Sequence, residues 1–541
     1  MKRTILITGI ILGLIALTAS TCGSRRDVFT IAMDGKFSTL DPIGSVTVDA
    51  NSERIRTLMY NSLIKKNEKF EYVGDLAESF TPGEDGLTYT FKLRDGVTFH
   101  DGSPLDSADV KYTFDKLFES RGAKASAFSV TENEQKVDII TSIEAPDEKT
   151  IVIRIVRPEF RNQLIPNLVP IAILPKDAPV GKGSGADTKP PMGTGPYKFV
   201  SFDPGQNVIE LESFDGYFEG APNIKQIRLM VLADANALQA ELLSGRVNLA
   251  PGASSLPPDS LKNIDETENL KVVRSKGSNI QYLWFNTQAE PVNDKAVRQA
   301  VAYAVNRERL INDVLAGAAT IAHSILPEQS WAYEAGTQYN HDPAKARALL
   351  DEAGLKDTNG DGMREMKPLI LKISSSSRTV QQYSQVIQNQ LKEVGIPMEI
   401  ESLEAQTMRS QVQGGQFIVT TGIWVGGNSD PIFLKDLFSS ANIPIPDRVG
   451  LNRGRYKNER VDELLDQAFA EPDQEKAKQL YVEAQKIISE ELPLFPLWYP
   501  NNIIIASESV DNIEMNASGD WDFVRKLTYQ PGPFSGAEPQ K

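Results

Sequence analysis

An Asp/Asn/Gly segment at residues 357–362, DTNGDG, has the residue types and spacing of a calcium-binding loop. In such loops, side-chain oxygens at positions one, three and five bind the ion, and a glycine at position six allows a sharp turn. The oxygen donors here are Asp357, Asn359 and Asp361. Pro368 stands at position twelve, where a bidentate glutamate is expected, and Glu365 offers a supplementary carboxylate. The pattern fits a structural calcium site, and it fits better a solvated loop before a strand that begins at Leu369.

Residues suited to acid–base or nucleophilic catalysis are scarce. The chain has 3 histidines, His100, His323 and His341, and contains no G-x-S-x-G, H-E-x-x-H or phosphate-loop motif. His100 stands in an HDG turn, where a structural role is expected. The 72 acidic residues could include the carboxylate pair of a glycosidase. A secreted hydrolase is therefore a remote alternative, and we expect a protein that is not an enzyme and has no cofactor, with a structural calcium ion in the loop at 357–362 as the alternative.

Residues 1–21 have the three-part layout of a secretory signal: a basic start, an apolar run and a small-residue stretch. As a helix, the run at 5–17 is about 20 Å long, too short for the roughly 30 Å of a bilayer core. Cys22, the only cysteine, follows directly and resembles the lipoprotein cleavage site, where the cysteine is acylated and becomes the mature N-terminus. Ala19 stands where such signals usually have leucine, so ordinary signal-peptidase cleavage is the alternative. Both predict an exported protein.

The amino-acid composition limits the kinds of molecule that the protein is expected to bind. The chain of 541 residues carries 72 acidic and 57 basic residues, a formal net charge of −15. An acidic surface repels phosphate backbones and anionic lipid headgroups, so nucleic acid is not expected as a partner. A single cysteine excludes an intrachain disulfide. An apolar fraction of 40% is ordinary for a folded protein, and the length predicts several lobes.

Strand-like and helix-like segments alternate along the chain, which predicts an α/β fold. Strands include those expected at 89–93, 150–156, 227–232, 282–285 and 369–374. Helices with apolar residues at core spacing are expected at 108–119, 343–353 and 380–394. Ser107 is the expected cap of the first of these helices. Gly96, Gly102 and Gly195 are expected in turns that need unusual backbone angles.

A series of motifs recurs in order along nearly all the chain beyond the signal. They are LDP at 40–42, DLAES at 75–79, GLTYTFKLRDGVTFHDGSPLDSADVKYTFDKL from 86, GTGPY at 193–197, LSGRVN at 243–248, FNT at 285–287, VRQA at 297–300, WVGGNSDP at 424–431 and ELPL at 491–494. In combination they resemble the family 5 extracytoplasmic solute-binding proteins, the peptide, oligopeptide and nickel receptors of ABC importers.

The resemblance implies a two-lobed periplasmic-binding-protein fold, type II-like, of the large cluster with an extra subdomain inserted in the first lobe. Hinge closure would enclose the ligand between the lobes. The implied boundaries are 28–65, 195–275 and 500–530 for the first lobe, 66–194 for the inserted subdomain, 276–499 for the second lobe, and 531–541 for a flexible tail.

The same resemblance implies the function. We expect a monomeric receptor of the periplasm or cell envelope that captures a peptide or oligopeptide and delivers it to an ABC permease, with membrane contact only through the lipid anchor on Cys22. A receptor of the same fold for an oligosaccharide, an opine or a metal chelate is the alternative, because fold alone does not set the ligand.

The implied ligand site centres on residues 424–431. Peptide-binding relatives hold the ligand's ammonium with an aspartate three residues after the tryptophan, and here that position is Gly427, so Asp430 is the nearest substitute or a plain turn residue. Arg378 could bind a carboxylate bidentately. Two roles are expected for the aromatic residues Trp424, Trp498 and Tyr499: each either forms an apolar wall of the ligand site or packs in the core. The other predicted contacts are Val425, Gly427 and Asn428.

Overall fold

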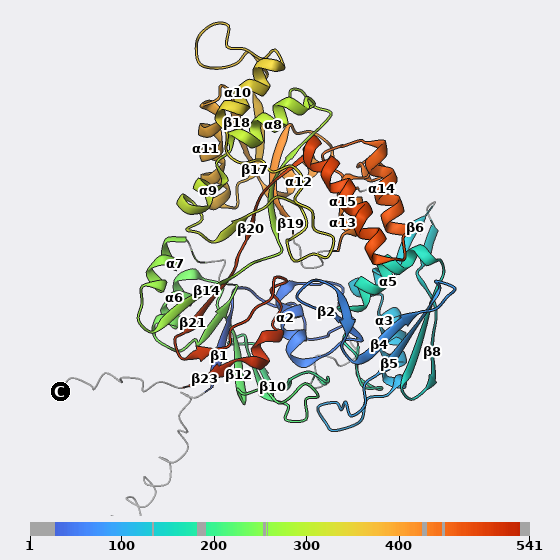
Figure 1. Ribbon diagram of the computed structural model, residues 1–541. Coiled ribbons are helices and arrows are strands. Elements are labelled where there is room, and N and C mark those ends of the chain that lie inside the picture. Colours follow the sequence, from blue (N-terminus) through green and yellow to red (C-terminus); the bar gives the residue numbers. More distant parts are fainter. Residues whose placement is uncertain are drawn as a thin grey trace, which may run out of the picture.

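The structure is a computed structural model that describes residues 28–132, 135–180, 191–252, 256, 258–424, 430–445 and 450–530. Figure 1 shows two bodies, one built around the strands β1, β12 and β21 and the other around β17, β19 and β20. The signal at 1–21, Cys22, the tail at 531–541 and the predicted contacts Val425, Gly427 and Asn428 lie outside the described residues.

The first lobe is built on a seven-stranded sheet of order β10-β11-β12-β1-β13-β21-β14. Its strands are β1 (Phe29–Met33), β10 (Tyr197–Asp203), β11 (Val208–Ser213), β12 (Gln226–Val231), β13 (Leu249–Pro251), β14 (Leu270–Ser275) and β21 (Asn502–Ser507). β1 pairs in parallel with β12 and β13, and the other pairs are antiparallel. Along β1, Phe29 and Ile31 enter one core and Ala32 enters another, as the period of two requires. The sheet is therefore buried on both faces.

An antiparallel sheet of order β4-β5-β9-β8 packs beside the first lobe. It contains β4 (Ala77–Pro82), β5 (Thr88–Leu93), β8 (Ile140–Asp147) and β9 (Thr150–Ile155), and the helix α3 (Ser107–Ser120) covers it. Its buried residues share one continuous core with those of the seven-stranded sheet. Asp106, rather than the expected Ser107, caps α3, because its carboxylate accepts hydrogen bonds from the N–H groups of Ala108 and Asp109.

The second lobe is built on a six-stranded sheet of order β16-β20-β15-β19-β17-β18. Its strands are β15 (Ile280–Phe285), β16 (Ala319–Ile321), β17 (Leu369–Ser374), β18 (Met398–Leu403), β19 (Val419–Trp424) and β20 (Leu494–Pro500). Every residue of β15 is buried. Leu283 and Phe285 face one core, and Ile280, Tyr282 and Trp284 face the other, which explains the almost continuous apolar sequence of this strand.

Helices cover the two faces of the six-stranded sheet in separate sets. On one face lie α8 (Lys295–Ala304), α10 (Pro343–Glu352) and α11 (Arg378–Lys392); on the other lie α13 (Ile432–Phe438), α14 (Glu459–Ala470) and α15 (Gln474–Glu491). The observed α/β architecture confirms the predicted fold class. Three of the helices, α3, α10 and α11, match expected segments to within a few residues at their ends.

Two crossovers join the lobes, one between β14 and β15 and one between β20 and β21. They lie side by side: a Cβ atom built on Gly277 would lie 2.1 Å from the carbonyl oxygen of Pro500. No side chain larger than hydrogen fits there. Both crossovers meet the first-lobe sheet at one edge, because Ser275 pairs with Asn502 and Pro251 with Ile504. That edge is also where β1 and β13 end.

Candidate functional site

The edge of the second-lobe sheet beside the crossovers gathers several predicted site residues. β17 and β19 are parallel, so their ends at Ser374 and Trp424 lie on the same side of the sheet. β15 runs antiparallel to β19 and begins there, with Ile280 opposite Trp424. Arg378 begins α11, which follows β17 after a short turn. In open α/β sheets, ligands bind outside the carboxyl ends of parallel strands. Trp424 and Arg378 both stand at such ends.

Trp424 is half-buried, with its ring edge-to-face against Phe433 at a centroid distance of 5.7 Å. Its indole Nε1 is buried and has no hydrogen-bond partner within the described parts of the chain. A buried, unsatisfied donor costs free energy unless a partner is supplied. Trp424 therefore combines an apolar surface with a donor that a ligand acceptor can satisfy.

Asp430 connects the two lobes. The hydroxyl of Tyr72 donates a 2.6 Å hydrogen bond to Asp430 Oδ2, and Oδ1 accepts one from the Ile432 N–H at 3.0 Å. Tyr72 begins β3 (Tyr72–Gly74), which forms a hairpin with β2 (Ile64–Lys66) in the part of the chain before β4. Both carboxylate oxygens of Asp430 are thus engaged by the protein. The role of Asp430 as an anchor for a ligand ammonium stays a prediction. In that role its carboxylate would accept hydrogen bonds from both the ammonium and the Tyr72 hydroxyl.

The ammonium group of Lys66 lies beside the contact between Tyr72 and Asp430. The Lys66 ammonium lies 4.8 Å from the centroid of the Tyr72 ring. Burial lowers the pKa of Lys66 to about 8, and the charge of Asp430 opposes that shift. Burial also raises the pKa of Tyr72 well above its ordinary value. The hydroxyl therefore stays protonated and donates the hydrogen bond to Asp430.

A second acid of this region, Asp436 on α13, was not predicted from the sequence. Burial raises its pKa to about 6; Lys435 opposes the shift and Asp430 adds to it. A positive group brought beside Asp436 would be favoured, because it would relieve the burial of this charge. In the sequence, Asp436 looks like any polar residue of an amphipathic helix, and no signal marks it.

A second contact between the lobes lies at the end of α14. Arg161 on α5 (Arg161–Leu168) donates to the carbonyl oxygens of Glu471 at 2.8 Å and Pro472 at 3.1 Å. Asn162 donates to the carbonyl oxygen of Phe469. The last carbonyls of a helix carry partial negative charge and lack partners within the helix, so an arginine suits them. Besides the crossovers, these two contacts therefore join the lobes within the described parts of the chain.

Trp498 and Tyr499 lie in the core of the second lobe. Trp498 is 2% exposed, with its ring edge-to-face against Tyr383 at 5.2 Å. The Tyr499 hydroxyl lies 2.6 Å from the main-chain oxygens of both Ser324 and Leu326, and its single hydrogen is donated to one of them at a time. These positions agree with the core alternative for both aromatics. Arg378 is exposed, and a contact with a ligand stays a prediction for it.

A buried polar network beside this edge also escaped sequence analysis. Gln281 Nε2 lies within hydrogen-bond distance of the Tyr383 hydroxyl at 2.9 Å, the Thr421 hydroxyl at 3.0 Å and the Gly422 carbonyl oxygen at 2.8 Å. The hydroxyl of Thr421 donates in turn to the carbonyl oxygen of Tyr282 at 2.8 Å. Fully bonded networks of this kind fix side-chain positions. The network holds β15, β19 and α11 in register at the crossover end of the sheet.

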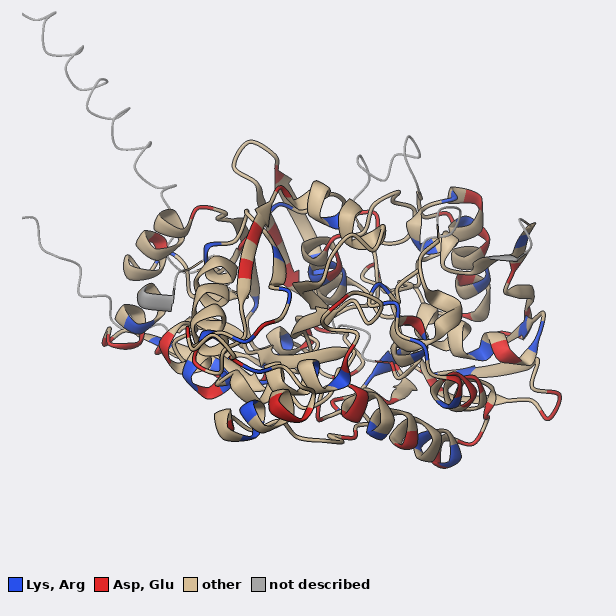
Figure 2. Cartoon of the chain, turned by 90° about the horizontal axis from the view of Figure 1, so that it is seen from above, with Lys and Arg blue, Asp and Glu red and all other residues tan. Residues whose placement is uncertain are grey.

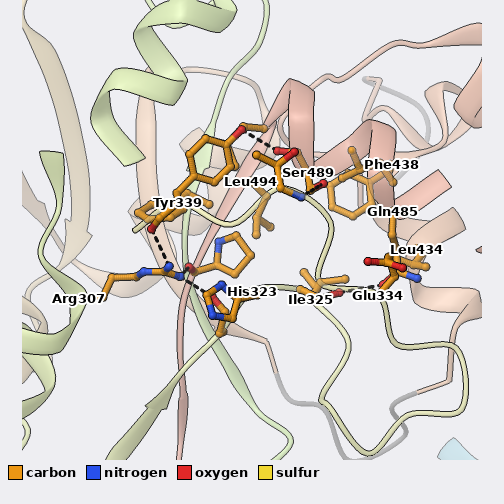
Figure 3. A pocket seen from close by; sticks show the side chains of 17 residues that line it. Arg307, His323, Ile325, Glu334, Tyr339, Leu434, Phe438, Gln485, Ser489 and Leu494 are labelled. Atoms are coloured by element: carbon orange, nitrogen blue, oxygen red, sulfur yellow. Dashed lines mark hydrogen bonds between the residues drawn. The ribbon is translucent and has the colours of Figure 1, made fainter. Parts of the chain in front are cut away.

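The second lobe also contains a small cavity of about 30 Å³ (Figure 3). Arg307 borders it and donates to the carbonyl oxygens of Pro496 at 2.9 Å and Tyr339 at 2.8 Å. Burial lowers the pKa of Arg307 to about 10. His323 Nδ1 is buried there with no partner in the described structure. A space of this size holds ordered water rather than a solute.

The predicted calcium loop is exposed and organised by its own hydrogen bonds. Asp357 accepts from the N–H groups of Gly360 at 2.7 Å and Gly362 at 2.9 Å. Glu365 accepts from the N–H of Thr358 at 2.8 Å. Asn359 and Asp361 lie on the same loop, and Asn359 Oδ1 accepts from the Asp361 N–H at 2.8 Å. The donor set fits a calcium ion in residue type, and calcium binding stays a prediction.

No group of three or more His, Cys, Asp or Glu side chains is placed to hold a metal ion in the described ranges. No helix in the same ranges is long and apolar enough to cross a membrane. Figure 2 shows acidic and basic residues interspersed over the molecule rather than segregated by sign.

Two sheet-based lobes, joined by paired crossovers and carrying aromatic and charged residues at one edge, define a two-lobed solute-binding protein. Residues 71–445 match the bacterial extracellular solute-binding proteins, family 5, and the chain belongs to that family. Members of this family are binding proteins.

Relatives align over nearly the whole chain. The oligopeptide-binding protein AppA of Bacillus subtilis (strain 168) is 29% identical over 493 residues, which cover 88% of this chain and 86% of AppA. The glutathione-binding protein GsiB of Escherichia coli (strain K12) is 29% identical over 516 residues, which cover 94% of each chain.

Solved structures share the fold. AppA of Bacillus subtilis in complex with a nonapeptide has a TM-score of 0.65 at 28% identity, covering 93% of this chain and 99% of AppA. NikA of Brucella suis in complex with Fe(III)-EDTA has a TM-score of 0.78 at 23% identity, covering 93% of this chain and 99% of NikA. The two-lobed architecture expected from the motifs is confirmed.

Proposed function

We propose that this protein is the substrate-binding subunit of an ABC importer, which captures a peptide or oligopeptide between its two lobes and delivers it to the permease. The observation that carries the proposal is the set of chemically suited residues where the sheets end beside the crossovers, with Trp424 foremost. The oligopeptide and glutathione ligands in the names of two relatives support a peptide-like solute.

Binding and release depend on movement about the crossovers. The crossovers are short and lie in contact, and the remaining described contacts between the lobes include Tyr72 with Asp430 and Arg161 with the end of α14. A few polar contacts can exchange more readily than an apolar core, so the lobes can separate and close again. No chemical conversion of the ligand is part of the proposal.

The proposal includes export and anchoring. Residues 1–21 are a secretory signal, and Cys22 becomes the acylated N-terminus of the mature chain. Several acyl chains on one cysteine suffice for stable anchoring, so the mature protein would be held at the cell envelope, and the proposal takes it to act there as a monomer. Mass spectrometry of the mature N-terminus tests this part directly, since acylation adds the mass of the fatty acids.

A non-peptide solute is the second candidate, favoured by one residue. Gly427 stands where peptide-binding relatives have the aspartate that holds the ligand's ammonium. An ammonium buried without a partner costs several kcal/mol. Either Asp430 or Asp436 supplies that charge, or the ligand has no free amine there, as in an oligosaccharide, an opine or a metal chelate.

A thermal-shift screen separates these candidates. The chain without residues 1–21 is melted with free peptides, N-acetylated peptides, oligosaccharides and nickel chelates. A ligand at 100 times its dissociation constant stabilises the folded state by about 2.7 kcal/mol. We expect stabilisation by peptides. Stabilisation by sugars or chelates alone would remove the peptide proposal, and a preference for acetylated peptides would exclude an acidic ammonium anchor.

A further inference from the structure

An arginine of the first lobe stands at the edge that meets the second lobe. Arg54 belongs to α2 (Ala50–Met59), and its side chain reaches the ends of two parallel strands. Asp34 follows β1 and lies 3.6 Å from Arg54 through Oδ1 and Nη1. Gly252 follows β13, and a Cβ atom built on it would lie 3.4 Å from Arg54 Nη2. Arg54 therefore lies where β1 and β13 end, the edge from which both crossovers leave.

The guanidinium is held in place on one side only. Nη1 donates to Asn51 Oδ1 at 2.9 Å, and Asn51 Nδ2 donates in turn to the carbonyl oxygen of Gly35 at 2.8 Å. The absence of a side chain at Gly252 lets the planar group lie close to the main chain. This packing fixes the orientation of Arg54 before any ligand arrives, which lowers the entropic cost of binding.

The other side of the guanidinium remains available. The side chain is 24% exposed, and the structure describes no acceptor for Nε or Nη2. These two nitrogens form one edge of the planar group, with parallel N–H bonds spaced to match the two oxygens of a carboxylate. Asp34 is too far from Nη1 for a hydrogen bond and partly balances the charge.

We propose that Arg54 is a first-lobe anchor for a carboxylate of the bound solute, which it engages through Nε and Nη2. The inference rests on the proposed solute-binding function and deepens it, because it assigns the ligand a free carboxylate facing the first lobe. The source of that group is either the C-terminus of a peptide or an acid group of a non-peptide solute, and the chemistry is the same.

The test uses the chain that begins at residue 22 and two matched sets of ligands. One set contains synthetic tripeptides and hexapeptides as free acids, with the same peptides as C-terminal amides. The other contains citrate and succinate with their amides. Calorimetric titration gives the dissociation constants for the wild type and for Arg54→Met. We expect the acids to bind more tightly than the amides, and Arg54→Met to weaken acid binding by about 10- to 100-fold without changing amide binding.

Two further variants guard against a folding defect. Arg228→Met is the matched control: Arg228 lies in the same lobe, pairs with Glu210 at 3.0 Å and is 19% exposed, but it stands in the middle of β12 opposite Thr30. It should leave both dissociation constants unchanged. Asp34→Asn removes the competing carboxylate and should tighten acid binding. A change of opposite sign cannot come from misfolding.

The binding experiments distinguish a failure of the proposed role of Arg54 from a failure of the proposed peptide binding. Peptide acids and amides binding equally, or an acid preference that survives in Arg54→Met, would overturn the role of Arg54 and leave peptide binding intact. Binding of citrate or succinate alone, lost in Arg54→Met, would support Arg54 and remove the peptide ligand. Binding of no carboxylate at all would overturn the inference.

Discussion

Tyr72 and Asp430 are 358 positions apart in the chain, yet the tyrosine hydroxyl donates a 2.6 Å hydrogen bond to the aspartate carboxylate across the two lobes. The bond joins the β2–β3 hairpin to the start of α13, at the predicted ligand motif. Because Asp430 is charged, this bond is stronger than one between neutral groups. If the predicted motif binds the ligand, Asp430 would couple closure of the lobes to the chemistry of the ligand site.

Tyr72→Phe removes this bond and leaves the ring in place. We expect the closed arrangement to lose about 1.5 kcal/mol and the affinity for the solute to fall about tenfold, because the ligand must then supply the part of the closure energy that this bond contributed. Titration calorimetry measures the affinity, and small-angle scattering of the ligand-free protein measures the opening. Tyr112→Phe is the control, since Tyr112 donates to the carbonyl oxygen of Ala178 at 2.7 Å within one lobe. Equal affinities for Tyr72→Phe and the wild type would contradict the coupling.

Arg161 provides an independent test of closure, because it donates hydrogen bonds to main-chain oxygens at the end of α14 and not to Asp430. Arg161→Met should increase the radius of gyration of the ligand-free protein and weaken solute binding by about 3-fold, a smaller effect because the charge of this half-buried residue is partly screened by solvent. Arg460→Met serves as the control: its partners, Glu463 and Glu483, both lie in the second lobe. An unchanged scattering curve for Arg161→Met would show that this contact does not hold the lobes together.

The strands and helices were accessible from sequence because local patterns determine them. The expected helix at 380–394 appears as α11, and the strand expected at 369–374 appears as β17. The predicted cap of α3 was wrong because two neighbouring residues can both cap the helix. Asp106 and Ser107 can both cap α3, and the carboxylate forms the reciprocal bonds with Asp109. The sequence alone does not show which of the two residues is the cap, because the choice depends on which side chain reaches the first N–H groups of the helix.

Glycine roles were only partly predictable. Gly96 and Gly102 have the positive φ values, +74° and +87°, that the turns were expected to need. Gly195 does not: a Cβ atom built on it would lie 2.4 Å from the carbonyl carbon of Met59. Its glycine is required by the close approach of a segment more than 130 positions earlier in the chain, which no local pattern reveals.

The candidate site was harder to predict for the same reason. The place of Arg378 between β17 and α11 follows from the expected strand at 369–374 and helix at 380–394, since the order of strand, turn and helix is local, whereas the strand that ends at Trp424 was not predicted. The partner of Asp430 and the burial of Asp436 depend on contacts between distant segments. Trp498 could have faced either side of β20, because a strand buried on both faces has no polar alternation to orient it.

His100 should make stability depend on pH. Its Nδ1 accepts from the Gly193 N–H at 3.3 Å, so Nε2 carries the proton and donates to the Gly195 carbonyl oxygen at 3.1 Å. Burial lowers the pKa of His100 to about 4, against an ordinary 6.5. Between those values the unfolded chain binds more protons, so the free energy of unfolding rises with pH. Stability is therefore lost as pH falls from 6.5 toward 4, by at most about 3 kcal/mol.

Urea unfolding at pH 7.5, 5.5 and 4.5 measures this effect. Because carboxylates also titrate in that range, the informative quantity is the difference between the wild type and His100→Gln, in which the imidazole is absent. We expect a shallower loss of stability on acidification for His100→Gln. His341→Gln, at an exposed histidine, is the control and should follow the wild type. Parallel curves for His100→Gln and the wild type would assign the pH dependence to other groups.

The loop at 357–362 allows a final prediction about calcium. Asp357 and Glu365 already accept main-chain hydrogen bonds from the loop, and Pro368 replaces the bidentate glutamate. A loop held by its own hydrogen bonds needs no ion to keep its shape, so we expect the same melting temperature in EDTA and in 1 mM calcium. A site with a dissociation constant near 10 µM would instead stabilise the protein by about 2.7 kcal/mol at that concentration. A calcium-dependent rise in melting temperature that disappears in Asp361→Asn would contradict the prediction and establish the loop as a structural calcium site.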